Sequence, residues 1–476
     1  MIIYPTKKIF GRLKKKFNLI PIFAKLNSDE YPLSIYSKLR GKHSFILNSP
    51  MEDCDLGRYS FIGFEPFLTI KSKGRDIFLN GKHYKGNPIK ILKKKLNLFK
   101  SIKNSRLPLF FGGAAGYFSY DIAHFFERLP KNAVDDMNIP DMYFLFINKS
   151  IIFDHLTNEL FIVVLGNDYE KSLNEIGRIK KIIESRPIKN PGKQIKCGPL
   201  KSNFKKSEYI EAIGKIKEYI KAGDTFQVNI SQRMEADIFG DPLAVYERLI
   251  KINPAPFSAL MEFDDIKIIS SSPERLVRLE NGIVNTRPIA GTRRRGKTKE
   301  EDLKLEKELL SSEKERAEHT MLVDLERNDI GKVCDYGSVK LTEAMAVEKY
   351  SHVMHLVSNI QGKIHKSKDR FDLLKAVFPG GTITGCPKIR TMEIIDELEP
   401  NARGPYTGSL GYFNFAGDMD FNIIIRTLIM KGNKIYTQVG GGIVADSVPE
   451  EEYRETLYKA QAMIKSIKNH ENPTRA

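Results

Sequence analysis

The 476-residue sequence contains no tryptophan and only four cysteines. Cys54, Cys197, Cys334 and Cys386 lie far apart and form no CxxC pair. This spacing excludes a disulfide framework and a cysteine-based zinc site. It is typical of reduced thiols, so we expect a cytoplasmic protein.

Long hydrophobic runs are also missing. No apolar run approaches the roughly 18 residues that a membrane helix needs. The short apolar patch at residues 17–23 is interrupted by Pro21 and makes a poor signal peptide. We therefore expect no membrane segment.

The motifs of several common enzyme classes are absent. GxSxG, HExxH and EF-hand spacings do not occur. Gly112–Gly116 has the wrong spacing for a dinucleotide loop, and GGTITGCPK (380–388) has Cys386 where a phosphate loop needs lysine. His352 and His355 have no partner at zinc spacing.

Basic charge, in contrast, is in excess, with a formal net charge of +17. Only Lys7–Lys16 is a dense basic run, and elsewhere lysines alternate with acidic residues. An RNA-binding protein would need aromatic residues and lysines clustered on one sheet, and the sequence shows no such cluster. We expect no nucleic-acid partner, although small anionic substrates would suit this charge.

The pattern of apolar residues predicts an α+β fold, because strands and helices mix without a strict βαβ order. Pro- and Gly-containing residues 186–203 are the predicted linker between residues 1–185 and 204–470. Strands are expected at 44–47, 59–62, 67–70, 151–153, 160–164, 409–413, 423–426 and 434–438. Helices are expected at 168–185, 241–252, 312–325 and 449–467.

A hairpin is predicted at residues 276–286, because Asn281-Gly282 separates two apolar runs. Glu274 precedes the hairpin, and a small-residue turn at 288–292 follows it, so both should meet at one end. The adjacent Arg293–Arg295 would make this end a floor for an anionic substrate. The alternative is a surface hairpin with a basic loop.

Several charged residues and one run of glycines in the second half of the chain are candidates for a ligand site. Glu318 is placed on an apolar helix face, where it would pair with a core cation or serve as a metal ligand or acid. Glu455 and Lys459 have the spacing of a surface ion pair. Gly440–Gly442 could offer backbone N–H groups to a carboxylate or form a tight turn. Arg426, at the end of an apolar strand, would attract an anion.

Together, these stretches resemble the chorismate-utilising enzymes, namely the anthranilate synthase large subunit and aminodeoxychorismate synthase component I. The resemblance covers nearly the whole chain. The matching motifs are GRYSFIG (57–63), GGAAGYFSYDIAHFFERLP (112–130), FQVNISQR (226–233), SPER (272–275), TRPIAGTRRRG (286–296), ERAEHTMLVDLERNDIG (315–331), YSHVMHLVS (350–358), GGTITGCPKIRTMEIIDELEP (380–400), GYFNFAGDMDFNIIIRT (411–427) and GGGIVADSVPEEEYRET (440–456).

The resemblance implies one α+β unit of large antiparallel sheets packed in a sandwich and flanked by helices. Residues 1–185 would be the N-terminal region of this family, and 204–470 the chorismate-binding catalytic region. Glu318 and Glu455 match Mg²⁺ ligands, with Glu452 acting through water, which suits a hard cation. Glu274 matches the general acid that protonates the departing C4 hydroxyl.

Further residues match positions around the substrate, a dianion that needs cationic partners. Those matching carboxylate-holding positions are Tyr406, Arg426, Gly441, Gly442 and Lys459. Gly291, Thr292 and His355 match positions lining the ring, and Ala290 and Gln227 match positions that set the nucleophile.

Gln227 favours ammonia over water as the nucleophile. Relatives that use water carry a lysine base near this position, and glutamine cannot deprotonate water. No glutaminase nucleophile motif is present, so ammonia would come from a separate glutamine amidotransferase subunit or from free ammonium. A catalytically inactive family member would have lost a Mg²⁺ carboxylate, and none is lost here.

The product depends on two opposing signals. Ala290 resembles anthranilate synthase, because many aminodeoxychorismate synthases have a covalent lysine nucleophile there. NPAPFSA (253–259), the loop ending in Ser49, TITGCPK and DFNIIIRT resemble the aminodeoxychorismate form. Candidates for the inhibitor pocket are Ser49, Asn253, Pro254 and Phe257. The sequence favours 4-amino-4-deoxychorismate, with anthranilate and pyruvate as the alternative.

Overall fold

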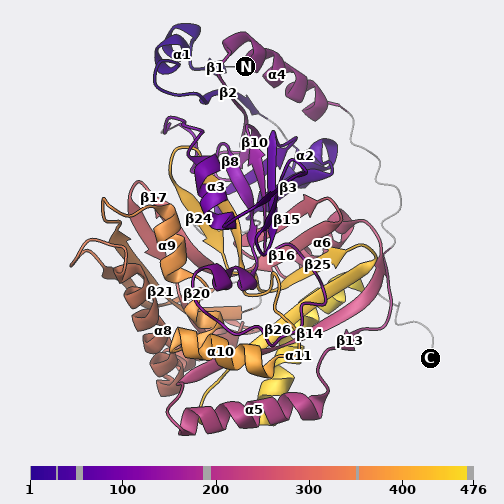
Figure 1. The fold of residues 1–476 in the computed structure, drawn as a ribbon, viewed down its shortest axis with the longest axis vertical. Helices are drawn as coiled ribbons and strands as arrows, with labels where there is room; N and C mark the ends of the chain where they lie inside the picture. The colour runs from indigo at the N-terminus through magenta and orange to yellow at the C-terminus, as the bar shows by residue number, and fades with distance from the viewer. Residues whose placement is uncertain are drawn as a thin grey trace.

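The computed structural model describes residues 2–27, 30–49, 57–104, 106–185, 195–349 and 353–468. They form an α+β fold built on two large antiparallel sheets (Figure 1). This is the predicted fold class. Cys54, His352 and the first half of the proposed linker, residues 186–194, lie outside the described residues, so the boundary between 185 and 204 stays a prediction.

The first sheet contains strands from both halves of the chain. In spatial order it comprises β1 (Ile2–Tyr4), β2 (Ile20–Asn27), β11 (Glu159–Gly166), β10 (Lys149–Asp154), β4 (Tyr59–Phe64), β3 (His43–Asn48), β15 (Phe257–Phe263), β16 (Ile266–Ser272), β25 (Thr427–Lys431), β26 (Lys434–Ile443), β14 (Gln227–Phe239) and β12 (Lys196–Cys197). Two short strands, β13 (Lys201–Ser202) and β22 (Gly385–Cys386), also pair with β14.

The second sheet is divided in the same way. Its order is β19 (Ile289–Arg294), β21 (Val353–Lys363), β18 (Ile283–Thr286), β17 (Arg275–Glu280), β24 (Met419–Asn422), β23 (Ser409–Asn414), β8 (Gly113–Phe118), β9 (Met142–Ile147), β5 (Leu68–Lys73), β6 (Asp76–Leu79) and β7 (Lys82–Lys85), with β20 (Lys340–Lys349) beside β21. Residues 1–185 therefore supply one end of each sheet, and the rest of the described chain supplies the other end.

Helices cover the outer faces of the sheets (Figure 1). Those over the first sheet are α1 (Lys7–Leu13), α2 (Pro32–Leu39), α4 (Tyr169–Ile183), α6 (Pro242–Ile252) and α11 (Pro449–Ile467). Two more helices, α5 (Lys206–Lys221) and α10 (Lys388–Leu398), pack against β14 of the same sheet. The remaining helices are α3 (Pro88–Leu96), α7 (Lys299–Ser311), α8 (Glu313–Gly331) and α9 (Arg370–Val377), and short 3-10 turns form at Tyr120–Phe125 and Gly381–Ile383.

The main hydrophobic core lies between the two sheets. Successive strand residues point to opposite faces, so Phe45 and Phe61 enter this core while Ile46 and Ile62 pack under the outer helices. Each such fully buried side chain stabilises the fold by roughly 1.5 to 3 kcal/mol. The tight packing fixes the strand ends from which the site is built.

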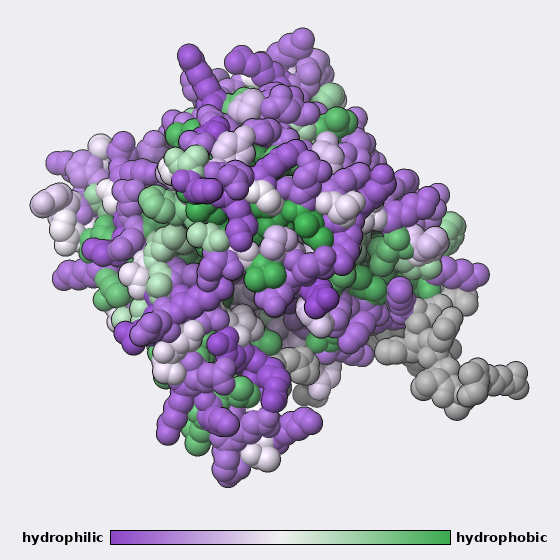
Figure 2. Space-filling view, turned by 90° about the horizontal axis from the view of Figure 1, so that it is seen from below, coloured by the Kyte–Doolittle hydropathy of each residue, from purple (hydrophilic) through white to green (hydrophobic). Residues whose placement is uncertain are grey.

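The surface in Figure 2 is mostly hydrophilic, with hydrophobic residues in scattered groups between charged ones. Among the described residues, no helix is both long and apolar enough to span a membrane.

The locally encoded elements are confirmed. The predicted hairpin forms from β17 and β18, and both turn residues, Asn281 and Gly282, have positive φ. Asp241 caps α6 through the Leu243 N–H, and Ser312 caps α8 through the Glu315 N–H. Helix α8 continues to Gly331, six residues beyond its predicted end.

Two predictions of secondary structure are wrong. Residues 423–426 form no strand, because the chain here crosses from β24 in the second sheet to β25 in the first. Residues 288–292 do not form a simple turn, because Ile289–Arg294 is a strand that pairs with β21. Its register is interrupted between Ala290 and Thr292, where Gly291 has φ +61°.

Candidate active site

The site begins at the crossing between the sheets. Arg426 has φ +50°, a left-handed conformation that L-residues rarely adopt, and it turns the chain into β25. Beyond Thr437, β25 no longer pairs with β26, so Gln438–Ile443 has a strand neighbour only on its β14 side. The Gly440 carbonyl on this open edge accepts from Lys459, and the N–H groups that point away from β14 are available to a ligand.

Gly440–Gly442 occupies that open edge. It is part of strand β26 and not the tight turn considered as an alternative. Side chains at all three glycines would collide with or crowd neighbouring groups: Asn229 and Tyr406 at Gly440, Glu452 at Gly441 and Gln227 at Gly442. Glycine is therefore required for these groups to approach the strand closely.

Arg426 is the cation best placed for an anionic ligand. Burial lowers the pKa of its guanidinium, while Tyr406 and Glu455 act in the opposite direction. Within the described part of the chain no ion pair satisfies Arg426, unlike Lys459, which bonds to Glu455 at 2.6 Å and to the Gly440 carbonyl at 3.0 Å. A half-buried guanidinium without an ion-pair partner favours a carboxylate ligand.

Glu274 has the properties of a proton donor at neutral pH. Its side chain is only 6% exposed, and burial raises its pKa to about 7, against the opposing effects of the Thr382 hydroxyl and Lys459. Thr382 donates a 2.6 Å hydrogen bond to Glu274 Oε1. The Glu274 carbonyl accepts from the Ile423 N–H, which ties the acid to the crossing at Arg426.

The strand pair β19–β21 supplies another wall. Thr292 and His355 are register partners, and Thr292 Oγ1 lies 3.0 Å from His355 Nδ1. His355 Nδ1 also lies 3.1 Å from the Gly291 carbonyl. Burial lowers the pKa of His355, which favours the neutral imidazole. Ala290 is half-buried and places no amine at this turn.

Three carboxylates form the acidic side of the site. Burial raises the pKa of Glu318, and the charge of Glu452 adds to this effect. Burial likewise raises the pKa of Glu452, helped by Glu455. Their mutual repulsion and the lack of a cation paired with Glu318 in the described residues suit a bound cation. These residues do not, however, converge in a ready-made group of three metal ligands.

A fully buried ion pair, Arg403 with Glu399, lies beneath the site and connects the segments that form it. Arg403 bonds to Glu399 and also donates to the carbonyls of Ile383 and Asn229. Glu399 accepts from the N–H and hydroxyl of Ser231 on β14. Loop 380–384, strand β14 and the segment before Tyr406 are thereby joined by one hydrogen-bond network.

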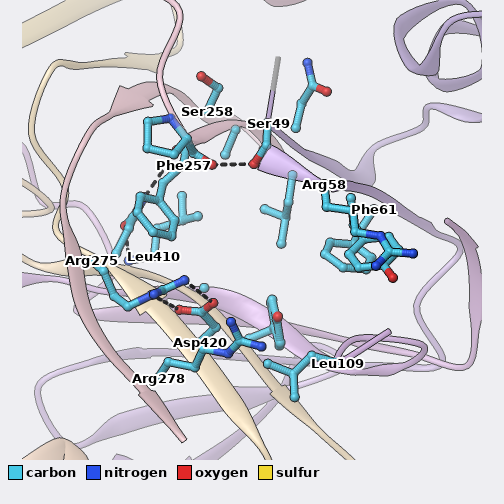
Figure 3. A pocket seen from close by; sticks show the side chains of 18 of the residues that line it. Ser49, Arg58, Phe61, Leu109, Phe257, Ser258, Arg275, Arg278, Leu410 and Asp420 are labelled. Carbon is cyan, nitrogen blue, oxygen red and sulfur yellow. Dashed lines mark hydrogen bonds and ion pairs between the residues drawn. The ribbon is translucent and has the colours of Figure 1, made fainter. Parts of the chain in front are cut away.

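A separate pocket lies between the sheets and is lined by residues from both halves of the chain (Figure 3). Its volume is about 200 Å³. Ser49 and Phe257 line it, with Ser49 donating to the Pro256 carbonyl at 2.5 Å. Arg275 extends across one wall to Asp420. Asn253 and Pro254 are not among the lining residues, and Asn253 instead donates to Ser271 behind helix α6.

The structure thus brings together most of the residues predicted for the site. Electrostatic coupling links Glu274 to Lys459, Arg426 to Tyr406 and Glu455, and Glu318 to Glu452. Sequence reasoning missed Thr382, Asn229 and the buried Glu326. All three stand within recognised motifs, but only tertiary structure shows which way they point.

Comparison with known proteins agrees with this geometry. A family model described as "chorismate binding enzyme" matches residues 42–465, so the chain belongs to the chorismate-binding enzyme family. It is 44% identical to anthranilate synthase component 1 of Acetivibrio thermocellus, over 98% of this chain and 99% of that protein. It is also 43% identical to aminodeoxychorismate synthase component 1 of Bacillus subtilis, over 91% of this chain and 93% of that protein.

A solved structure shows the same fold. The crystal structure of anthranilate synthase component I from Streptococcus pneumoniae TIGR4 matches with a TM-score of 0.79 and 35% identity. The match covers 92% of this chain and 98% of that one.

Proposed function

We propose that this chain is the chorismate-binding component of an anthranilate synthase and uses ammonia released by a separate glutamine amidotransferase. The buried Glu274 carries the chemical part of the proposal, because its pKa of about 7 keeps a proton available near neutral pH. The relatives named anthranilate synthase, including the structural match, favour this product over the one the sequence motifs favoured.

The proposed substrate complex follows from the charges. One carboxylate of chorismate would bind Arg426, Tyr406 and the open N–H group of Gly442 on the free edge of β26. The ring carboxylate would lie on the acidic side, where Glu318 and Glu455, with Glu452 through water, would hold Mg²⁺. When bound, Mg²⁺ would neutralise these carboxylates and the ring carboxylate together.

The reaction then needs an acid and a nucleophile. The ammonia lone pair forms the new C–N bond at the ring carbon adjacent to the one that bears the carboxylate, the ring double bonds shift, and the C4–O bond breaks. The departing hydroxide takes the Glu274 proton and leaves as water. The new ammonium group loses one proton, which restores the Glu274 carboxyl group.

Anthranilate requires a second step. The ring loses one proton and the enolpyruvyl group, and the released enolpyruvyl group takes up one proton to become pyruvate. The exposed Thr292 and the half-buried His355 would line the ring during this step. Formation of 4-amino-4-deoxychorismate would instead place nitrogen at C4 and keep the enolpyruvyl group.

The second candidate function, amination to 4-amino-4-deoxychorismate, rests on the pocket in Figure 3. The stretch 253–259, which resembles the aminodeoxychorismate form, places Phe257 in the wall of that pocket beside Asn48 and Ser49. The Bacillus subtilis relative is almost as similar as the anthranilate synthases.

A product assay separates the two functions. The purified chain is incubated with chorismate, Mg²⁺ and ammonium at mildly basic pH, and products are separated by chromatography. Anthranilate with an equal amount of pyruvate supports the first proposal. If the amine product retains the enolpyruvyl group and yields 4-aminobenzoate only after an aminodeoxychorismate lyase is added, the second function replaces it.

A further inference from the structure

Two buried amide oxygens near the glycine edge have no hydrogen-bond partner among the described residues. They are Gln227 Oε1 and Asn229 Oδ1. Asn229 is only 9% exposed, so water cannot readily satisfy this acceptor. Leaving a buried acceptor unpaired costs about 1 to 3 kcal/mol. Such a cost is expected where a ligand supplies the missing donor.

Both oxygens belong to the face of β14 that looks onto the site. Gln227 and Asn229 are two residues apart in the strand, so their side chains point to the same side. Asn229 Oδ1 and the Tyr406 hydroxyl lie 2.7 and 2.9 Å from the position that a Cβ on Gly440 would occupy. The Gln227 amide covers Gly442 in the same way.

The acidic side of the site approaches from the other face of the strand. Glu452 Oε2 lies 3.3 Å from the position of a Cβ on Gly441, the residue between the two covered glycines. The carboxylates and the amide oxygens thus flank the glycine edge from opposite sides. With the ring carboxylate on the acidic side and the second carboxylate at Arg426 and Tyr406, the two amide oxygens are left for the reaction partner of the substrate.

Chorismate cannot supply hydrogen-bond donors to both Gln227 Oε1 and Asn229 Oδ1. Its carboxylates accept hydrogen bonds, and it has one O–H donor, which the proposed mechanism places at Glu274. Ammonia has three N–H donors and one lone pair. We propose that Gln227 and Asn229 together form the ammonia-binding site, accepting two N–H bonds so that the lone pair faces the ring. This inference rests on the proposed amination of chorismate.

Neutral amides suit this task better than carboxylates would. A carboxylate would stabilise ammonium, which has no lone pair, and would raise the pKa of the bound nucleophile. Amide oxygens accept the N–H groups without adding charge. The nearby Arg426 guanidinium, which has no ion-pair partner among the described residues, further disfavours ammonium. Neutral ammonia is therefore the species selected.

The test measures ammonium dependence in Asn229→Leu, which keeps the side-chain size and removes the acceptor. Asn148→Leu is the matched control, because Asn148 Oδ1 is also buried and unpaired but lies between β9 and β10. We expect the KM for ammonium to rise about tenfold or more in Asn229→Leu, since one hydrogen bond is lost. The KM for chorismate should stay within about twofold in both variants.

Asn229→Asp provides a second measurement if the leucine variant is unstable. At fixed total ammonium, the wild-type rate should rise with pH as the ammonia pool grows. In Asn229→Asp the carboxylate retains ammonium, so the KM expressed as free ammonia should increase as pH falls. A structural role alone would not create this dependence.

The outcomes distinguish the inference from the proposed function. If the wild-type chain forms no amine from chorismate and ammonium, the proposed function fails and the inference with it. If the wild type forms the amine but both Asn229 variants keep its ammonium KM at every pH, only the ammonia site is wrong.

Discussion

Thr382 and Glu274 are 108 residues apart in sequence, yet the Thr382 hydroxyl donates a 2.6 Å hydrogen bond to Glu274 Oε1. This bond favours the carboxylate and partly opposes the effect of burial, which raises the pKa of Glu274 to about 7. Loop 380–384 therefore tunes the acid to physiological pH. Without the hydroxyl, Glu274 would hold its proton more tightly.

We predict that Thr382→Val shifts the alkaline limb of the pH–rate profile to higher pH. Glu274 must be protonated to donate, so the rate at constant free ammonia should fall as pH rises through about 7 in the wild type. Removing the hydroxyl raises the pKa of Glu274, so the decline should begin at higher pH. The measurement is kcat against pH at saturating chorismate and Mg²⁺.

Thr382→Ser is the control for this prediction, because serine keeps the hydroxyl. It should retain the wild-type profile. Glu274→Gln should lose about 100-fold or more of the rate and the alkaline limb with it. A valine profile that overlies the serine profile would contradict the tuning role.

The metal side can be tested by Glu318→Gln. The change removes a charged oxygen that is proposed to hold Mg²⁺. Glu318 forms no ion pair among the described residues, so the free energy of unfolding should change little. We expect turnover at saturating Mg²⁺ to fall by about 100-fold or more. Glu313→Gln, at the exposed start of the same helix, should retain full activity. If Glu318→Gln turns over chorismate at the wild-type rate, Glu318 is not a Mg²⁺ ligand.

How far the sequence predicts this site depends on how local each signal is. Asn281-Gly282 fixes the hairpin after Glu274, because both residues tolerate positive φ in a tight turn. Alternation in FQVNISQR indicates a strand, yet it cannot show that Gln227 and Asn229 face the glycines rather than the outer helices. That orientation is set by pairing with β26.

Arg426 shows what the sequence hides. Ile423-Ile424-Ile425 has the composition of a strand. It forms none, because its conformation is set by the strands that it connects, whose pairing partners lie far away in the sequence. The chain must leave β24 and enter β25 in the other sheet, so Arg426 adopts a left-handed conformation. No local residue preference signals this turn. For the same reason, the motif GGTITGCPK contains Thr382 but does not show that its hydroxyl reaches Glu274.

A buried carboxyl group behind the site should make stability depend on pH. Glu326 Oε2 is buried. Burial raises the pKa of Glu326 to about 8, against the opposing effect of the Thr286 hydroxyl and with a further contribution from Glu274. A pKa above the unfolded value means that the folded state binds more protons. Stability from this group is complete below the unfolded pKa and is lost as pH rises toward 8.

Glu326→Gln should therefore stabilise the protein at alkaline pH, by an amount on the order of 4 kcal/mol at pH 8 and above. Urea unfolding at pH 5 and pH 8 measures this change. The variant should lose less stability between the two pH values than the wild type. Asp324→Asn, on the exposed face of the same helix, should keep the wild-type difference. Equal pH dependence in both variants would contradict a neutral, buried Glu326.

Ala290 determines whether the chain can form a covalent adduct with its substrate. It lies in β19 opposite Leu356, one residue before Gly291, and it is half-buried beside the proposed ring-binding pair. A methyl group cannot attack the ring, so nitrogen must come from ammonia directly. We predict no stable adduct when the wild type is incubated with chorismate and Mg²⁺ without ammonium. Intact-protein mass spectrometry should show the mass of the unmodified chain.

Ala290→Lys provides the positive comparison, since it adds a primary amine to this turn. If the turn faces the ring, this variant should gain the mass of chorismate minus one water, because the lysine nitrogen replaces the departing hydroxyl. Thr298→Lys adds the same amine at the cap of α7, away from the glycine edge, and should gain no mass. A mass gain in the wild type would show that another residue acts as a nucleophile. If neither Ala290→Lys nor Thr298→Lys gains mass, the turn at Ala290 does not face the substrate ring.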